Sequence, residues 1–254
     1  MCRYIKLRLL ISDILKVYFQ AALLYFLSSG AFLAEEFSFK LSTKGITFAS
    51  FQMTAKNDPR TYRISSVFES SGILGAFTRI RIVSGAHGKI GTNDNLDFRP
   101  LEVLSKWQSL LNKKQSKIRY KDGKIIYYEV LPKARKNLYA IDPFTLKGVI
   151  DPLTVTFWML KSRTFNQLCR GKKLVSEGQS VISVHFQNKK ETDDLIHCQG
   201  QFKFLKGFDP HKYKKTNYSF NLTYEKSKQN LNIWTVKLMS FDTRIGLVKA
   251  LRTR

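Results

Sequence analysis

Hydrophobic and polar residues alternate with period two through most of the chain beyond residue 35. This pattern is typical of antiparallel strands that bury one face, because successive side chains of a strand point to opposite sides. Asp122-Gly123 separates two alternating segments and is a strong signal for a two-residue hairpin, and Glu177-Gly178 predicts another. The pattern therefore predicts a mainly β fold, a large curved antiparallel sheet or half-barrel. Alternation is cleanest in the C-terminal third, in residues 196–204, 218–224, 234–238 and 245–251.

One segment changes to helical periodicity. Asp151 followed by Pro152 is typical of an N-cap with proline at the first helical position, and apolar residues then recur three and four positions apart. The spacing predicts a helix over residues 152–162. With one well-capped apolar helix among many strands, we expect this helix to pack on the concave face of the sheet. Its apolar side chains would fill the concavity: Leu153, Phe157, Trp158 and Leu160.

Two further segments are less regular. Residues 101–111 fit a helix by the spacing of their leucines and Trp107, and fit a strand equally well from Pro100 onward. Near Ser50 the alternation changes phase, which predicts a β-bulge. No internal repeat or low-complexity linker interrupts the chain, so residues 32–254 are predicted to form a single β-rich domain.

The N-terminus has the order of an export signal. Four basic residues precede an apolar run, Val17 to Leu27, which ends in the small residues 28–31. Residues 1–31 are therefore interpreted as a signal peptide, cleaved before Phe32. The alternative is an uncleaved anchor over residues 17–34, a segment close to the length of a membrane-spanning helix and weakened by Gln20 and the small polar residues. Both interpretations export the body of the protein, and we expect a periplasmic location.

The chain is strongly basic, with a formal net charge of +24. Such a field attracts polyanions, which for an exported protein are anionic lipid head groups or lipopolysaccharide. Nucleic acid is disfavoured, because the aromatic residues keep the strand alternation of core residues instead of forming a stacking surface. Since the basic residues are scattered along the whole chain, a general lysine-rich composition is the other explanation of the charge.

Candidate chemistry is sparse. Cys169 and Cys198 remain after removal of the signal, and an even number of cysteines in an oxidising compartment predicts one disulfide, the alternative being two unpaired core thiols. His185 and His197 lie on predicted strands without the spacing of a metal site. The motifs of serine hydrolases, phosphate-binding loops and zinc proteases are absent from the sequence. We therefore expect no catalytic residues, no metal, no cofactor and a non-enzymatic role.

The C-terminal half resembles a known family of bacterial envelope proteins. Residues 148–154, Gly-Val-Ile-Asp-Pro-Leu-Thr, are followed by Cys169, a hairpin at Gly178, Cys198, and Gly207 between Lys and Phe. This order is similar to domain-of-unknown-function family 3108, and the likeness extends over about residues 36–254. The chain departs from the family pattern with Ser176-Glu177-Gly178 in place of Phe-Asp-Gly, and near Trp234, where a proline is usual. The family distantly resembles half-barrels of the lipoprotein carriers LolA and LolB. No catalytic residues are established for the family, so the resemblance assigns none to this chain.

Three functions are compatible with these observations. The leading hypothesis is a protein that holds a lipid or another apolar ligand, such as an acyl chain, in the concave sheet. The alternative is a basic interaction module that docks on lipopolysaccharide, an anionic membrane surface or an acidic protein. A hydrolase of envelope polymers is disfavoured by the lack of a triad or a carboxylate pair. The sequence identifies no particular protein partner.

Overall fold

The computed structural model describes residues 33–91, 97–133, 137–192, 194–243 and 246–253. The chain divides into two units, and the described residues from Ala34 onward belong to the second, the compact unit Ala34–Arg254. The proposed signal peptide, residues 1–31, lies outside the described residues, so its cleavage stays a prediction. All contacts given below lie within the second unit.

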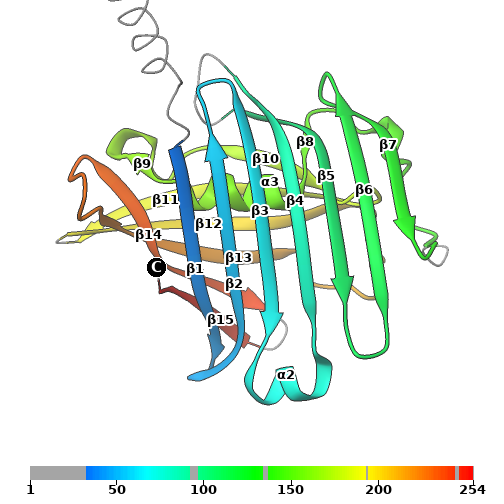
Figure 1. Ribbon diagram of the computed structural model, residues 1–254, viewed down its shortest axis with the longest axis horizontal. Helices are drawn as coiled ribbons and strands as arrows, with labels where there is room; N and C mark the ends of the chain where they lie inside the picture. Colours follow the sequence, from blue (N-terminus) through cyan, green and yellow to red (C-terminus); the bar gives the residue numbers. More distant parts are fainter. Residues whose placement is uncertain (1–32, 92–96, 134–136, 193, 244–245, 254) are drawn as a thin grey trace, which may run out of the picture. The chain divides into compact units, whose positions relative to one another are not determined.

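The dominant element is a 15-stranded sheet, almost entirely antiparallel, and the predicted mainly β, curved-sheet class is confirmed (Figure 1). The N-terminal half is built from seven strands in chain order: β1 (Leu33–Thr43), β2 (Ile46–Asn57), β3 (Thr61–Ser70), β4 (Arg81–Ile90), β5 (Phe98–Gln108), β6 (Lys113–Lys121) and β7 (Lys124–Leu131). The C-terminal half comprises β8 (Val149–Ile150), β9 (Arg163–Thr164), β10 (Lys172–Ser176), β11 (Val181–Thr192), β12 (Leu195–Lys206), β13 (Asn217–Lys226), β14 (Ile233–Thr243) and β15 (Gly246–Arg252).

The two halves are joined at the ends of the chain. β1 pairs antiparallel with β15, in a register that sets Phe39 opposite Arg252 and Thr43 opposite Val248. The strand order accordingly runs from β7 back to β1, crosses to β15 and then runs back to β8, while β9 pairs with β14 beside this path. The hairpin predicted at Asp122-Gly123 joins β6 to β7, with φ of 51° and 71° at the two residues, as a type I′ turn requires.

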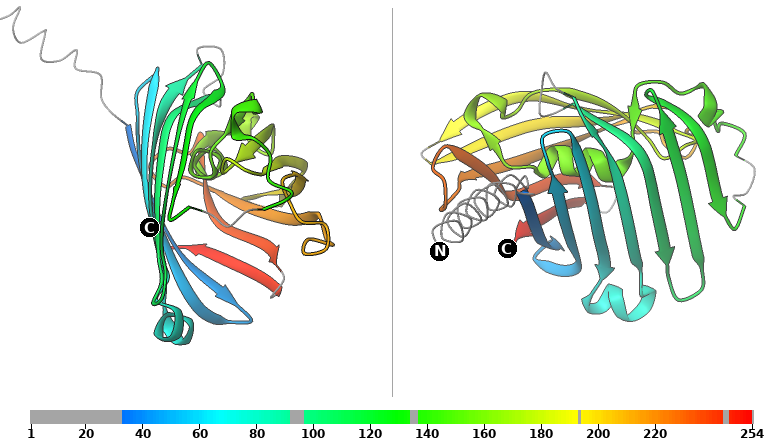
Figure 2. Two further views of the ribbon diagram at one scale, coloured as in Figure 1. Left: turned by 90° about the vertical axis from the view of Figure 1, so that its right-hand side faces the viewer. Right: turned by 45° about the horizontal axis from the view of Figure 1, so that its top comes forward.

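The predicted helix is α3 (Pro152–Leu160), and it lies between the two halves of the sheet (Figures 1 and 2). It packs against β3, β4 and β5 on one side and against β10 on the other. It ends two residues earlier than predicted, because Lys161 leaves the helical conformation with a ψ of 136°. The remaining helical segments of the described residues are short: α2 (Gly72–Thr78), η1 (Pro143–Thr145) and η2 (Phe165–Gln167).

The two edges of the sheet approach each other, so the sheet is barrel-like and nearly closed. The N–H of Gly148, just before β8, donates to the carbonyl of Gly123 at 2.8 Å, and Lys124 forms an isolated bridge with Lys147. The turn between β10 and β11 rests on β7, where Gly178, with a φ of 114°, is so close to the Tyr128 ring that a Cβ would clash with it. These contacts join β7 to the opposite edge of the sheet.

Three local expectations need correction or a decision. Residues 101–111 belong mostly to strand β5, because the pairing partners on β4 and β6 outweigh their helical spacing. The prediction of a bulge near Ser50 is wrong for the β2–β3 pair, because the register is unbroken from Ala49 to Asn57. In β15 the alternation of residues 245–251 buries the smaller side chains: Val248 and Ala250 are buried, whereas Leu247 and Leu251, expected in the core because of their size, are about half exposed. Ile245, expected on that strand, lies outside the described residues.

Candidate functional site

The interior of the sheet contains an apolar cavity of about 220 Å³ beside α3. Among the described residues that line it, Thr156 and Ser240 alone are polar. The lining passes from buried residues such as Leu222 and Ala250 to half-buried ones such as Phe51 and Phe241. Both halves of the sheet and the helix contribute: Phe39, Leu41, Phe51, Phe68, Val155, Thr156, Met159, Phe202, Phe220, Leu222, Met239, Ser240, Phe241 and Ala250.

The four helix residues singled out from the sequence lie in the packed core beside this cavity. Their exposed fractions are 7% for Leu153, 0% for Phe157, 1% for Trp158 and 0% for Leu160. The Phe157 ring centroid is 5.3 Å from that of Phe98 and 6.3 Å from that of Phe37. None of the four lines the cavity, so they fill one part of the concavity and leave another part hollow.

The cavity-lining residues of α3, which sequence reasoning missed, are Val155, Thr156 and Met159. A signal for them existed, because α3 is hydrophobic on nearly every side, and such a helix is buried on all its faces. The residues predicted from the sequence lie on one face of α3, whereas Val155, Thr156 and Met159 lie on another face, which is directed toward β12 to β15.

A one-residue irregularity shapes the far wall of the cavity. The register between β13 and β14 shifts between Thr223 and Tyr224, so that Leu222 lies opposite Met239 while Tyr224 lies opposite Val236. Met239 and Phe241 thus line the cavity. A strict continuation of the alternation from Trp234 and Val236 would have placed Leu238 there instead. A β-bulge has this effect because it changes the side-chain phase of one strand beyond it.

A glycine brings an aromatic ring into the same wall. Gly200 on β12 lies directly opposite Phe220 on β13, and a Cβ at this position would clash with the Phe220 ring and the His185 carbonyl. The Phe220 ring packs between Phe186 and Phe202, with centroid distances of 5.4 and 4.7 Å. Gly200 therefore lets Phe220 lie over the strand at the boundary between the packed core and the cavity.

Buried polar groups hold the N-terminus of α3. Asp151 caps the helix by accepting hydrogen bonds from the Thr154 N–H at 2.8 Å and the Thr154 hydroxyl at 2.6 Å. The Tyr62 hydroxyl lies 3.0 Å from the Thr154 hydroxyl. Burial raises the pKa of the Asp151 carboxyl, against the lowering effect of its hydrogen bonds, and burial also raises the pKa of Tyr62 and Tyr120. This cluster fixes the helix to β3.

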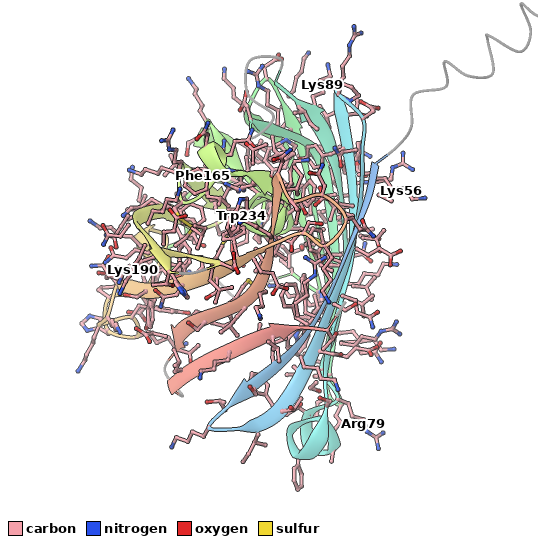
Figure 3. All side chains as sticks on the ribbon, turned by 90° about the vertical axis from the view of Figure 1, so that its left-hand side faces the viewer. Lys56, Arg79, Lys89, Phe165, Lys190 and Trp234 are labelled. Carbon is pink, nitrogen blue, oxygen red and sulfur yellow. A yellow bond between two sulfur atoms is a disulfide. The ribbon has the colours of Figure 1, made fainter. Side chains whose placement is uncertain are left out.

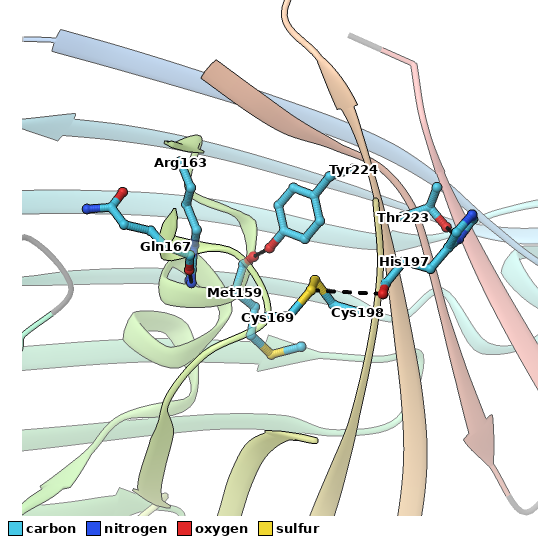
Figure 4. Close-up of a disulfide and its surroundings, with 8 residues drawn as sticks. All are labelled: Met159, Arg163, Gln167, Cys169, His197, Cys198, Thr223 and Tyr224. Carbon is cyan, nitrogen blue, oxygen red and sulfur yellow. Dashed lines mark hydrogen bonds between the residues drawn. A yellow bond between two sulfur atoms is a disulfide. The ribbon is translucent and has the colours of Figure 1, made fainter. Parts of the chain in front are cut away.

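The C-terminus of α3 is held from two directions (Figure 4). The Tyr224 hydroxyl donates to the Met159 carbonyl at 2.9 Å, and the buried Arg163 guanidinium donates to the carbonyls of Trp158 and Gln167. Donors at this end satisfy carbonyls that have no partner inside the helix. With both ends bound to the sheet, α3 forms a fixed wall of the cavity.

The two cysteines of the described residues, Cys169 and Cys198, lie near this end of the helix. Cys169 and Cys198 form a disulfide with a Cα–Cα distance of 5.0 Å, joining the segment after η2 to strand β12 (Figure 4). The Cys169 Sγ is 3.9 Å from the His197 carbonyl oxygen, which is a contact only, since a disulfide sulfur carries no proton. Both ring nitrogens of His197 face threonine hydroxyls, those of Thr223 at 3.2 Å and Thr192 at 2.9 Å.

The described part of the chain lacks two features that mark other classes of protein. Within those residues, no three His, Cys, Asp or Glu side chains are grouped so that they could hold a metal ion. Within the same ranges, no helix has the length and apolar character needed to cross a membrane.

Comparisons with known proteins give a structural likeness but no relative by sequence. No family model matches the chain, and no curated protein matches it either. A crystal structure of a beta-barrel-like protein of domain-of-unknown-function family 1849, from Brucella abortus, is similar with a TM-score of 0.46 and 11% identity, over 88% of this chain and 97% of that one. At this level of similarity the likeness carries no argument about a ligand. Membership of family 3108 stays a prediction.

Proposed function

We propose that this protein is a non-catalytic, exported protein of the bacterial envelope that holds one slender apolar chain, such as a fatty acyl chain, in the cavity beside α3. The observation that carries the proposal is the partly open apolar hollow of about 220 Å³ beside the filled core. Binding sites for small apolar ligands are typically concave and lined mostly by hydrophobic and aromatic side chains. A hollow of this size, lined by three different parts of the fold, is accordingly interpreted as a binding site.

The size of the cavity limits the ligand. At ~30 Å³ for each water-sized group, 220 Å³ holds about seven such groups, and a methylene group is of similar size. The volume is below the ~300–1,000 Å³ typical of sites for drug-sized molecules. A single chain fits these dimensions, whereas a ring system or a two-chain lipid is too large to enter completely.

The expected affinity follows from the same count. Burial of about seven methylenes at ~0.8 kcal/mol each gives roughly 6 kcal/mol, which corresponds to a Kd on the order of 0.1 mM. A polar end group outside the cavity would have to supply any tighter binding. The lining offers it little, because Thr156 already donates its hydroxyl proton to the Pro152 carbonyl at 2.8 Å.

The test is calorimetric titration of the purified full chain with decanoic acid and with decanol. We expect both to bind, since the contact is with the chain and not with the carboxylate. Ala250→Leu places three additional carbon atoms in the cavity and is expected to weaken binding about tenfold or more, with little loss of stability because the atoms enter free space. Native mass spectrometry of the freshly purified protein should show a co-purifying acyl species.

The matched control is Ala34→Leu, the same substitution at an exposed position of β1. It is expected to bind decanol as the unmodified protein does. Equal binding by the two variants would place the ligand outside the cavity. The absence of binding by the folded, unmodified protein would refute the proposal altogether.

A further inference from the structure

The outer face of the N-terminal half carries a second hollow, separate from the interior cavity. It has a volume of about 500 Å³ and lies over β2, β3, β4 and β5. Its lining combines polar and charged residues with apolar ones, unlike the almost wholly apolar lining of the interior cavity. The lining residues are Thr54, Lys56, Arg63, Ile64, Ser65, Gly85, Ala86, His87, Glu102 and Leu104. In Figure 3 Lys56 projects from the side of the sheet that faces away from α3.

The register of the sheet aligns the basic residues of the hollow in one cross-strand row. Lys56 lies opposite Arg63, and Arg63 opposite His87. The row continues through Glu102 to Arg119. Directly opposite residues of neighbouring strands have Cβ atoms ~4.5–5.5 Å apart, so their side chains share one region of the surface.

The neighbouring row explains why the surface is hollowed here. It consists of Thr54, Ser65 and Gly85, which also lie opposite one another across β2, β3 and β4. Their side chains are short or absent, whereas the basic row beside them has long side chains. The result is a depression with hydroxyl groups in its floor and cations along its rim.

The charged residues of this row differ in whether they have an oppositely charged partner. Glu102 accepts from Arg119 Nε at 2.8 Å and lies 3.2 Å from Lys117 Nζ, and these partners lower the pKa of its carboxyl. Among the described residues, no carboxylate forms an ion pair with Lys56, Arg63 or His87. Like charges directly opposite each other in a sheet are destabilising. The Lys56–Arg63 pair therefore favours a bound anion.

We propose that this hollow binds the phosphate group of a ligand, with Lys56 and Arg63 as its cations and the Thr54 and Ser65 hydroxyls and the His87 imidazole as further hydrogen-bonding groups. Guanidinium groups suit phosphate because they donate two parallel hydrogen bonds to its oxygens. The volume of about 500 Å³ exceeds that of one phosphate and leaves room for the polar body that carries it. A soluble phosphate ester and a phospholipid head group share this chemistry.

The inference is tested on the purified full chain at low salt, by proton–nitrogen correlation spectra of its four histidine side chains. The probes are inorganic phosphate, glycerophosphate, and vesicles of phosphatidylglycerol or phosphatidylcholine. We expect the His87 signal, assigned by its loss in His87→Gln, to shift saturably while those of His185, His197 and His211 stay in place. Saturation by glycerophosphate indicates a soluble ester, whereas a response to phosphatidylglycerol vesicles alone indicates a lipid head group; both support the site.

Paired variants separate the hollow from general basicity. Lys56→Gln with Arg63→Gln is expected to weaken binding about tenfold or more, since two charge-assisted contacts are lost. Its unfolding temperature should stay equal or rise, because a repulsive pair is removed. The control, Lys190→Gln with Lys203→Gln, removes the same charge from exposed positions of β11 and β12 and should bind as before.

Two results would overturn the inference. One is equal loss of binding in the two double variants, which would mean that net charge alone attracts the anion. The other is an unmoved His87 signal with every phosphate probe. Neither depends on the interior cavity, because decanol binding is measured independently on the same variants.

Discussion

Asp151 is a carboxyl group with no exposed surface, placed where the helix needs a hydrogen-bond acceptor. Its two oxygens accept from the Thr154 backbone and side chain, and the positive end of the α3 dipole lies beside it. Burial nevertheless raises the pKa of the carboxyl above its ordinary value of 3.8. The folded state thus holds the Asp151 proton more tightly than the unfolded state does.

This predicts a specific dependence of stability on pH. A group whose folded-state pKa is raised stabilises fully below its unfolded pKa, and this contribution is lost as the pH rises through the folded pKa, by about 1.4 kcal/mol for each unit between the two. Asp151→Asn keeps an acceptor for the Thr154 N–H and carries no charge. In urea unfolding, the free energy of the unmodified protein minus that of Asp151→Asn should fall as the pH rises above 3.8.

The difference between the two proteins cancels the titration of every other group. A constant difference across this range would mean that the hydrogen bonds of Asp151 compensate its burial completely. A difference that increases with pH would contradict the direction of the pKa shift.

At the scale of elements, α3 is the part on which the interior depends. The N-terminal cluster and the two donors at its C-terminus hold it to both halves of the sheet, and Glu35 on β1 adds a hydrogen bond to the Ser162 N–H at 2.9 Å. Lys161 Nζ also lies 3.5 Å from the Glu35 carboxylate. The helix itself is only nine residues long, so tertiary contacts must supply most of its stability.

Phe157→Ala is expected to lower the free energy of unfolding by about 3–5 kcal/mol, because the ring is wholly buried against Phe37 and Phe98 and its removal leaves a cavity. The comparison is Phe165→Ala, at a ring that is 40% exposed, for which about 1 kcal/mol is expected. Urea unfolding of both variants provides the measurement. Similar losses in the two would show that α3 does not anchor the core.

The disulfide connects the segment that follows α3 to strand β12. The bridged residues are 29 positions apart, and closing a loop of this length stabilises by about 3.6 kcal/mol on the chain-entropy model. We expect the exported protein to resist alkylation of Cys169 and Cys198 until it is reduced, and Cys169→Ser with Cys198→Ser to unfold at lower urea. Mass spectrometry decides the pairing: two thiols that alkylate freely in the unreduced, denatured protein would rule it out.

At the scale of the whole sheet, two candidate sites lie on opposite faces of the same strands. β3 contributes Tyr62 and Ile64 to the interior, and Arg63 and Ser65 to the outer hollow. Alternation along one strand thus supplies both an apolar and a basic surface. The proposed apolar chain inside and the proposed phosphate outside would therefore bind independently of each other, one sheet apart.

At the scale of the whole molecule, we also predict that the protein is exported from the cytosol. Alkaline phosphatase fused after Arg254 should be active, because the basic residues before the apolar run keep the N-terminus in the cytosol and send the body outward. High salt should release the fusion from membranes if it is held only by surface charge, at about 1 kcal/mol for each nearby Lys or Arg. Activity that stays with salt-washed membranes would favour the uncleaved anchor over residues 17–34, and an inactive fusion would contradict export.

The sequence by itself determined what depends on near neighbours. Period-two alternation specifies strands because it records which side of a strand is buried, and Asp122-Gly123 specifies a turn because both residues tolerate positive φ. Asp151 before Pro152 marked the start of α3 correctly, since capping is a contact across three residues. The fold class and the helix position follow from such short-range rules.

Only the tertiary structure decided how these elements meet. The pairing of β1 with β15 joins residues more than 200 positions apart, and no local pattern records it. The shift between Thr223 and Tyr224, which turns Met239 toward the cavity, depends on the partner strand. Lys56, Arg63 and His87 become one row only through the registers of two hairpins. Both candidate sites therefore depend on the register between strands, which a strand's own sequence constrains weakly because its backbone hydrogen bonds are the same for every partner.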